Sequence, residues 1–326
     1  MKSNVLTLKK KKHMPTVGQR LGRQGKLFCR DWQLHLLILI PVIYMLIFDY
    51  YPMYGVQIAF RDYRPKTGIT GSEWVGWKHF EKFITSYNFR RYLWNTLSLS
   101  FQTIIISFPL PIILALLLNT IRNEKFKTFV QRVTYIPHFI SLVVLVAMFN
   151  QIFNPLNGLY GTLYHVFGGE GKPTDIRGLE ATFQTIYVWT GVWQNLGWNT
   201  IIYTAALSAV SHEQHEAAEI DGASRLQRIF HVDIPAILPT ICIMLILRCG
   251  SVMSIGFEKV YLLQSSLNLP VSEVISTHVY KVGMDKPSNY SYGSAIGLFN
   301  SAVNCTLLIF VNWITKKLSD REVSLF

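Results

Sequence analysis

Charged residues are scarce in this sequence. Lys, Arg, Asp and Glu make up 15% of its 326 residues, whereas a soluble domain carries about 25%. Half of the residues are hydrophobic, and the mean hydropathy is +0.26. This balance excludes an ordinary soluble enzyme and indicates a chain with several membrane spans.

Cysteine is also scarce. The four cysteines are Cys29, Cys242, Cys249 and Cys305, and the last three lie inside apolar segments. They form no disulfide framework, and we interpret them as small buried thiols. No span carries a nucleophile–base pair or a metal-ligand pattern, so the sequence predicts neither catalytic nor metal-binding residues.

A nucleotide-binding loop is missing. The pattern G-x-x-x-x-G-K-[ST] does not occur, and its nearest approach, residues 168–172, is followed by Pro173 instead of Ser or Thr. The chain is therefore not expected to hydrolyse ATP or to hold a cofactor of its own. Any ATP and Mg²⁺ would be used by other subunits.

Apolar runs dominate what is present. Each is about 20 residues long, which is the length that a helix needs to cross the hydrocarbon core of a bilayer. They predict an all-α integral membrane protein with six transmembrane helices: Leu34–Tyr54, Leu93–Leu118, Val133–Phe153, Phe183–Val210, Ile237–Ile255 and Tyr292–Ile314.

The distribution of basic residues predicts the orientation of these spans. The net charge is +12, and 18 Lys and Arg lie in the two tails and the even-numbered loops, against 12 in the opposite loops. Since basic residues collect on the cytoplasmic side, both termini are expected there. The predicted parts are a basic tail, 1–33, a transmembrane domain, 34–315, and a C-terminal tail, 316–326.

Polar residues inside two spans are candidates for a substrate pathway. The fourth span contains Trp193, Asn195 and Asn199, which suit sugars, although amide side chains also join helices in bilayers. Arg248 lies midway along the fifth span, where a charge costs about 2.5–3.5 kcal/mol. It must face either an acidic partner elsewhere in the assembly or a wet, pore-lining cavity.

The polar segment 211–239 separates the fourth and fifth spans. Ser211 and Gln214 have the spacing of a capping box, and Gly222 suits the left-handed end of a first, acidic helix. A second short helix, with Arg225 and Arg228, is expected to stop at Ile234-Pro235. The segment is therefore predicted to project from the membrane as two helices joined at a glycine.

Three functions compete for this segment. DNA binding is disfavoured, because phosphate would repel the acidic first helix and both ends enter a membrane. His212, His215, Glu216 and Glu219 share one helical face, yet their order differs from H-E-x-x-H, which favours solvated histidines over a metal site. The third interpretation is a surface that docks a cytoplasmic protein and transmits motion to the spans.

A family resemblance favours docking. The pattern E-A-A-x3-G, followed by an apolar-Pro pair, resembles the coupling loop of bacterial ABC importer permeases of the binding-protein-dependent sugar class. Val232 and Ile234 replace the usual Ile and Leu. The matching positions, which the resemblance assigns to ATPase coupling, are Glu216, Ala217, Ala218, Asp221, Gly222, Arg225 and Pro235.

The resemblance covers nearly the whole chain beyond the N-terminal tail. Segments 256–264, 272–283 and 291–319 are similar to the branch that moves oligosaccharides and polysaccharide fragments, including alginate-type permeases. It implies a type I ABC importer fold with a cytoplasmic coupling helix in a bacterial inner membrane. The implied partners are a second permease, two ATPase subunits, an extracytoplasmic solute-binding protein, the oligosaccharide and lipid, but no nucleic acid.

One alternative comes from another class of transporter. The broken, polar fourth span would also suit an ion-coupled secondary transporter of a small polar solute. The spans contain few acids to carry protons, which argues against it. Within the oligosaccharide hypothesis, Arg248 and the basic balance favour an acidic sugar, because guanidinium pairs well with carboxylate.

Overall fold

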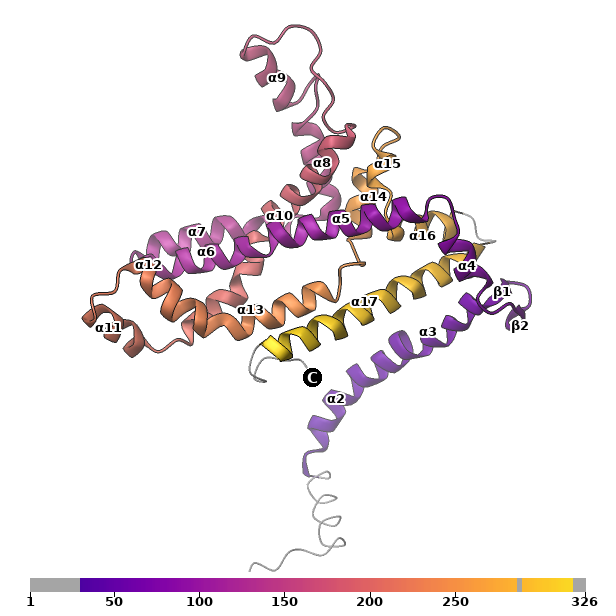
Figure 1. Ribbon diagram of the computed structural model, residues 1–326, viewed down its shortest axis with the longest axis horizontal. Coiled ribbons are helices and arrows are strands. Elements are labelled where there is room, and N and C mark those ends of the chain that lie inside the picture. The colour runs from indigo at the N-terminus through magenta and orange to yellow at the C-terminus, as the bar shows by residue number, and fades with distance from the viewer. Residues whose placement is uncertain (1–29, 286–288, 319–326) are drawn as a thin grey trace, which may run out of the picture. The chain divides into compact units, whose positions relative to one another are not determined.

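The computed structural model describes residues 30–285 and 289–318 (Figure 1). Contacts divide the chain into two compact units, residues 1–57 and 58–326. Most of the predicted basic tail, residues 1–29, lies outside the described residues, as do residues 319–326 of the predicted C-terminal tail.

The first unit is one apolar helical run. It consists of α2 (Trp32–Met45), a π-helical turn η1 (Leu46–Tyr50) and α3 (Tyr51–Met53), and a 3₁₀ segment η2 (Tyr54–Phe60) leads into the second unit. The run from Trp32 to Phe60 is long and apolar enough to cross a membrane, although none of its most apolar window is buried within the protein. Side chains of this kind belong in lipid, as predicted for the first span.

A small hairpin opens the second unit. Strands β1 (Arg61–Arg64) and β2 (Gly68–Trp74) pair antiparallel, and α4 (Lys78–Ile84) follows them. The all-α prediction is wrong here, because residues 65–67 form a turn in which the Thr67 N–H donates to the Arg64 carbonyl at 3.0 Å, and Gly68, with φ +69°, begins β2. The other regular elements of the described second unit are helices joined by turns and loops.

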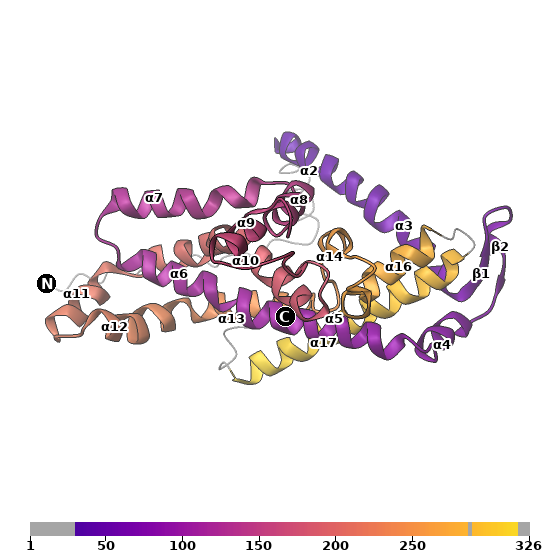
Figure 2. The same cartoon turned by 90° about the horizontal axis from the view of Figure 1, so that it is seen from above.

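Long helices form the body of this unit. Both views show them running alongside one another (Figures 1 and 2). The central helix is α10, which packs on α5, α6 and α13, while α17 packs on α13 and α16. Buried Leu99, Phe183 and Val188 form part of the core around α10. The bounds are α5 (Phe89–Ser107), α6 (Pro109–Thr120), α10 (Glu180–Ser208), α13 (Ile234–Cys249) and α17 (Tyr290–Leu318).

The predicted third span is bent rather than straight. The helical run 124–139 meets α8 at an angle of 101°. Helix α7 ends at Tyr135, and Pro137 lies in the 3₁₀ turn η3 that completes the first run. Ser141 caps α8 by accepting a hydrogen bond from the Val144 N–H. The elements are α7 (Glu124–Tyr135), η3 (Ile136–Phe139) and α8 (Leu142–Ile152), and α9 (Leu159–Val166) follows.

Four helices among the described residues are long and apolar enough to cross a membrane, and the bent pair makes a fifth. The candidates in the second unit are Phe89–Thr120, Arg225–Cys249 and Tyr290–Lys317. Helix α10 has sufficient length but is too polar to qualify, because amide and hydroxyl residues recur along it. The fifth predicted span also ends earlier than expected, at Cys249 instead of Ile255.

Short helices occupy the two ends of the second unit. Helices α11 and α12 lie at one end, and α16 lies near the other in both views (Figures 1 and 2). Their bounds, with those of the adjoining elements, are α11 (His212–Ile220), α12 (Arg225–Arg228), η4 (Ile229–Asp233), α14 (Phe257–Leu263), α15 (Leu269–Ser272) and α16 (Ile275–Gly283).

Candidate functional site

Helix α11 is capped at its N-terminus by a hydrogen bond to Ser211. The Ser211 hydroxyl accepts from the Glu213 N–H at 3.2 Å, so the capping box predicted with Gln214 is wrong. The box forms one helix later instead. There the Ser224 hydroxyl accepts from the Gln227 N–H at 3.4 Å, and the Gln227 side chain accepts from the Ser224 N–H at 2.7 Å. This box fixes the start of α12.

The turn between α11 and α12 depends on Gly222. Its φ is +76°, in the left-handed region. The Ala223 N–H donates to the Ala218 carbonyl at 2.9 Å, and the Gly222 N–H donates to the Glu219 carbonyl at 3.1 Å. This pair of bonds is the Schellman arrangement. The predicted glycine turn is confirmed.

The second short helix does not stop where the sequence indicates. A π-helical turn, η4, carries α12 directly into α13, and Pro235 lies in the first turn of α13. The predicted end at Ile234-Pro235 is wrong because proline is tolerated in a first turn, where its missing N–H would be unpaired anyway. Helix α12 is therefore joined to a candidate span without an intervening loop.

Several charged side chains in this segment form pairs with one another. Glu219 forms an ion pair with Arg228, which joins α11 to α12. His212 Nδ1 lies 3.1 Å from a Glu216 carboxylate oxygen. Among the described residues no group of three His, Cys, Asp or Glu side chains could hold a metal ion. The histidines contact carboxylates instead.

Asp233 is a buried acid that the sequence analysis missed. Only 2% of its surface is exposed. Its carboxylate accepts from the Asn119 side-chain amide at 3.2 Å and lies 3.3 Å from His215 Nε2. Asp233 thus ties α11 to the end of α6 and to the start of α13. The signal was an acid directly before an apolar run, since such a group must find donors when it is buried.

Large apolar side chains of α11, α12 and η4 are exposed. Ile220 is 87% exposed, Leu226 67% and Phe230 62%. A neighbouring cavity of about 310 Å³ is lined by Glu216 and Arg225, among others. The remaining residues predicted for coupling are exposed, except for half-buried Ala218: Ala217, Asp221, Gly222 and Pro235.

A second polar site lies along α10. A cavity of about 180 Å³ is bounded by α5, α10, α13 and α14. Gly191, Asn195 and Asn199 follow one another at four-residue intervals on the α10 wall, about 6 Å apart along the helix axis. Thr103 and Ser107, also four residues apart, line it from α5.

Arg248 lies at the junction of two cavities. It lines the first and, with Asn199 and Ser107, a second cavity of about 300 Å³. The part of the chain that the structure describes gives its guanidinium no ion pair. The structure therefore brings together three of the residues predicted for the substrate pathway.

Trp193, the fourth predicted pathway residue, lies elsewhere. It lines neither of these cavities and packs edge-to-face on Phe149, with ring centroids 5.6 Å apart. A residue two positions from Gly191 or Asn195 lies about 200° around the helix, which explains its place on the other face.

Lys259, unlike the exposed Arg248, is a buried cation, and the sequence analysis missed it. It is 7% exposed, and its ammonium donates to the Tyr187 carbonyl at 2.7 Å and lies 4.7 Å from the centroid of the Tyr187 ring. Burial lowers the pKa of Lys259 to about 7. The sequence alone gives no clear signal for its burial, since a lysine just beyond a span is usually solvated.

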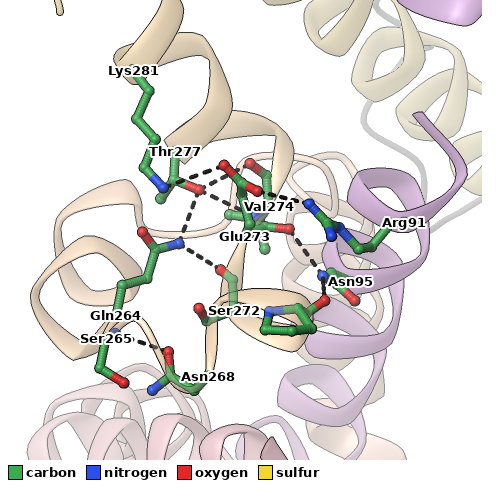
Figure 3. Close-up of polar contacts among 11 residues, drawn as sticks. Arg91, Asn95, Gln264, Ser265, Asn268, Ser272, Glu273, Val274, Thr277 and Lys281 are labelled. Carbon is green, nitrogen blue, oxygen red and sulfur yellow. Dashed lines mark hydrogen bonds and ion pairs between the residues drawn. The ribbon is translucent and has the colours of Figure 1, made fainter. Parts of the chain in front are cut away.

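A network around Glu273 holds together the elements near the other end (Figure 3). The carboxylate is 3.1 Å from Arg91 of α5 and 3.3 Å from Lys281 of α16. The Asn95 amide donates to the Glu273 carbonyl at 3.0 Å, and the Gln264 amide donates to the Thr277 hydroxyl at 3.2 Å. These ion pairs and amide hydrogen bonds connect α5, α14 and α16.

Comparison with known proteins assigns this architecture to a family. Residues 107–320 match the family described as the binding-protein-dependent transport system inner membrane component. The chain belongs to this family. The match confirms the resemblance drawn from the coupling-loop pattern, and it identifies a membrane transport component rather than an enzyme. It also favours the permease hypothesis over the ion-coupled alternative.

Two relatives from Bacillus subtilis (strain 168) cover most of this permease. The polygalacturonan/rhamnogalacturonan transport system permease protein YteP is 43% identical over 290 residues, 89% of each chain. Protein LplB is 40% identical over 318 residues, 97% of this chain and 98% of its own.

Solved structures show the same fold. A bacterial ABC transporter that imports the acidic polysaccharide alginate has a chain that is 32% identical, with a TM-score of 0.82, over 91% of this permease and 99% of that chain. A second structure, 31% identical with a TM-score of 0.82, holds the alginate transporter in complex with a periplasmic protein bound to an alginate pentasaccharide. It covers 92% of this permease and 99% of that chain.

Proposed function

We propose that this permease forms half of the translocation pathway of an ATP-driven importer for acidic oligosaccharides. The other half would be a second homologous permease, with two ATPase subunits on the cytoplasmic side. An extracytoplasmic solute-binding protein would deliver the sugar, as the alginate complex illustrates for its own periplasmic protein. ATP and Mg²⁺ would be bound by the ATPase subunits and not by this chain.

The proposed topology has six spans with both termini in the cytoplasm of a bacterial inner membrane. Five segments are apolar enough to cross a membrane, and α10 would be the sixth. Its polar side chains would be tolerated because α5, α6 and α13 surround it. The segment 211–239 would then face the cytoplasm, as the distribution of basic residues predicts.

The observation that carries the coupling role is the exposure of large apolar side chains on α11, α12 and η4. Ile220, Leu226 and Phe230 are exposed on these elements, and Glu216 and Arg225 line the polar cavity of the same segment. Large apolar side chains that lack cover in the free subunit are typical of a protein interface. They would bind in a surface groove of an ATPase subunit, and the continuous α12–η4–α13 run would carry the force of ATP binding into the membrane.

The proposed acidity of the substrate depends on Arg248. Its guanidinium faces two cavities and has no ion pair within the described chain. Two similar transporters support the same substrate class, since one is named for polygalacturonan and the other for alginate, and both polymers contain uronate units. A uronate unit would supply the carboxylate, and Asn195 and Asn199 would hydrogen-bond to its hydroxyl groups.

The coupling role can be tested in the assembled transporter. Glu216→Lys reverses a charge at the proposed interface, and Gly222→Pro removes the left-handed turn, for which proline is locked in the wrong φ region. We expect each to lower substrate-stimulated ATPase activity and uptake about tenfold or more while the permease still inserts in the membrane.

Glu124→Lys is the matched control. Glu124 is also exposed and begins a helix, α7, but it lies outside the proposed interface. Its reversal should change coupled ATPase activity less than about twofold. Coupled activity at the wild-type level in Glu216→Lys and Gly222→Pro would overturn the assignment of this surface.

A further inference from the structure

Two cations share one cavity without an acid to balance them. Arg248 of α13 and Lys259 of α14 both line the 180 Å³ cavity along α10. Neither forms an ion pair in the part of the chain that the structure describes. By contrast, the clusters around the buried acids Asp233 and Glu273 contain both signs of charge.

The position of Lys259 is built into the fold. A Cβ atom at Gly191 would lie 2.9 Å from the Lys259 ammonium nitrogen, so the missing side chain of this residue makes room for the ammonium against α10. Lys259 donates to the Tyr187 carbonyl, one turn earlier on the same helix. The ammonium is therefore held at one end of the row formed by Gly191, Asn195 and Asn199.

The hydrogen bonding of Lys259 is incomplete. An ammonium has three N–H donors, and one of them reaches the Tyr187 carbonyl. A buried charge is costly unless it is paired, and the Tyr187 ring offsets only part of this cost by its contact with the ammonium. An anion that entered the cavity would supply the missing acceptors.

We propose that Lys259 is a second carboxylate-binding residue of the pathway and acts with Arg248 on an acidic sugar. The inference rests on the proposed acidic substrate. It adds Lys259 as a residue that distinguishes acidic from neutral oligosaccharides. Arg248 lines both cavities and would bind a carboxylate of a sugar in either of them. Lys259, which is buried at the α14 end of one cavity, would hold a carboxylate at a fixed point beside Asn195.

The test uses the complete transporter with its binding protein in liposomes. ATP-dependent uptake is measured for trigalacturonate and for its methyl ester, which has the same linkages but no charge. Lys259→Met keeps the length of the side chain and removes the charge. We expect it to lower uptake of the acid about tenfold and to leave uptake of the ester within about twofold, while Lys259→Arg restores most of the uptake of the acid.

Lys281→Met is the matched control, since Lys281 is paired with Glu273 outside the cavity. It should affect acid and ester alike. Gly191→Ala is an independent variant that leaves Lys259 in place, and its added Cβ would displace the ammonium. We expect it to lower uptake of the acid severalfold and uptake of the ester much less.

The outcomes separate this inference from the proposed function. A wild-type transporter that imports the ester but not the acid would overturn the acidic substrate and this inference together. Wild-type import of the acid, with equal import by Lys259→Met and Gly191→Ala, would overturn the role of Lys259 alone. An equal loss of both substrates in Lys259→Met, without rescue by arginine, would show that the ammonium only joins α14 to α10.

Discussion

The Glu273 network and the α10 cavity use the same residue types in opposite ways. In the network, the Glu273 carboxylate lies between Arg91 and Lys281, and amide groups satisfy the neighbouring carbonyls (Figure 3). In the cavity, the described chain places Arg248 and Lys259 near amides and hydroxyls but opposite no acid.

The difference shows how to distinguish a cluster that holds the fold from one that awaits a ligand. A carboxylate between two cations is satisfied internally and needs nothing more. A buried cation without an acid, such as Lys259, costs free energy in the empty protein, and this cost is recovered when an anion binds. We therefore expect changes in the network to affect stability and changes in the cavity to affect the choice of substrate.

The largest effect is expected from Arg248→Met. Loss of a charge-assisted hydrogen bond costs about 1.5–3 kcal/mol, which corresponds to roughly 10- to 100-fold in uptake of trigalacturonate. Uptake of its methyl ester should change little, and the thermal unfolding temperature of the solubilised transporter should not fall, because an apolar residue replaces an unpaired charge.

The same variant can break the comparison. If Arg248→Met lowers uptake of acid and ester equally and lowers the unfolding temperature, the guanidinium forms a structural ion pair with an acid of the second permease. The α10 cavity would then be a balanced cluster of the same kind as the network, completed across the subunit interface.

A smaller effect, of the opposite kind, is expected from Glu273→Gln. It leaves Arg91 and Lys281 facing a neutral amide, and we expect a loss of about 1–2 kcal/mol in the free energy of unfolding, a value reduced because Arg91 is 41% exposed. Differential scanning calorimetry or thermal unfolding followed by fluorescence would measure it. The ratio of acid to ester uptake should stay at the wild-type value, and a changed ratio would contradict the structural role of Glu273.

Much of the fold could be predicted because spans depend on composition. Apolar runs locate most of the long helices, and Gly222 marks its turn because a left-handed residue has a strong preference for glycine. The bend near Pro137 was not predicted, and the helix end predicted at Ile234-Pro235 was wrong. A proline ends one helix and begins another, and only the packing of neighbouring helices decides which occurs.

The candidate site was partly predictable for a similar reason. Arg248 is conspicuous because it interrupts an apolar span, and Asn195 and Asn199 share a helical face by their spacing. Lys259 was missed, since a lysine just beyond a span looks solvated until α14 is seen packed against α10. Asp233 was missed because its partners, Asn119 and His215, are remote in sequence and meet it only in the folded chain.

The smallest effect is a dependence on pH. The pKa of Lys259 lies at about 7 because of burial, so about nine-tenths of it is charged at pH 6 and about one-tenth at pH 8. The other titratable or charged groups that face this cavity are Tyr187 of α10 and Arg248 of α13. Because the lowered pKa means that charge is lost as pH rises, uptake of trigalacturonate should fall about two- to fivefold over this range. A bound carboxylate favours the charged form and keeps the change modest.

Comparison with Lys259→Arg isolates this effect, since arginine stays charged throughout. The ratio of wild-type to Lys259→Arg uptake should decline between pH 6 and pH 8, whatever the pH does to ATP hydrolysis by the partner subunits. The same ratio for the methyl ester should be flat. A flat ratio for the acid as well would mean that the ammonium keeps its proton across this range, which requires an acid from the second permease. Lys259 would then be balanced in the way that Arg91 and Lys281 are by Glu273.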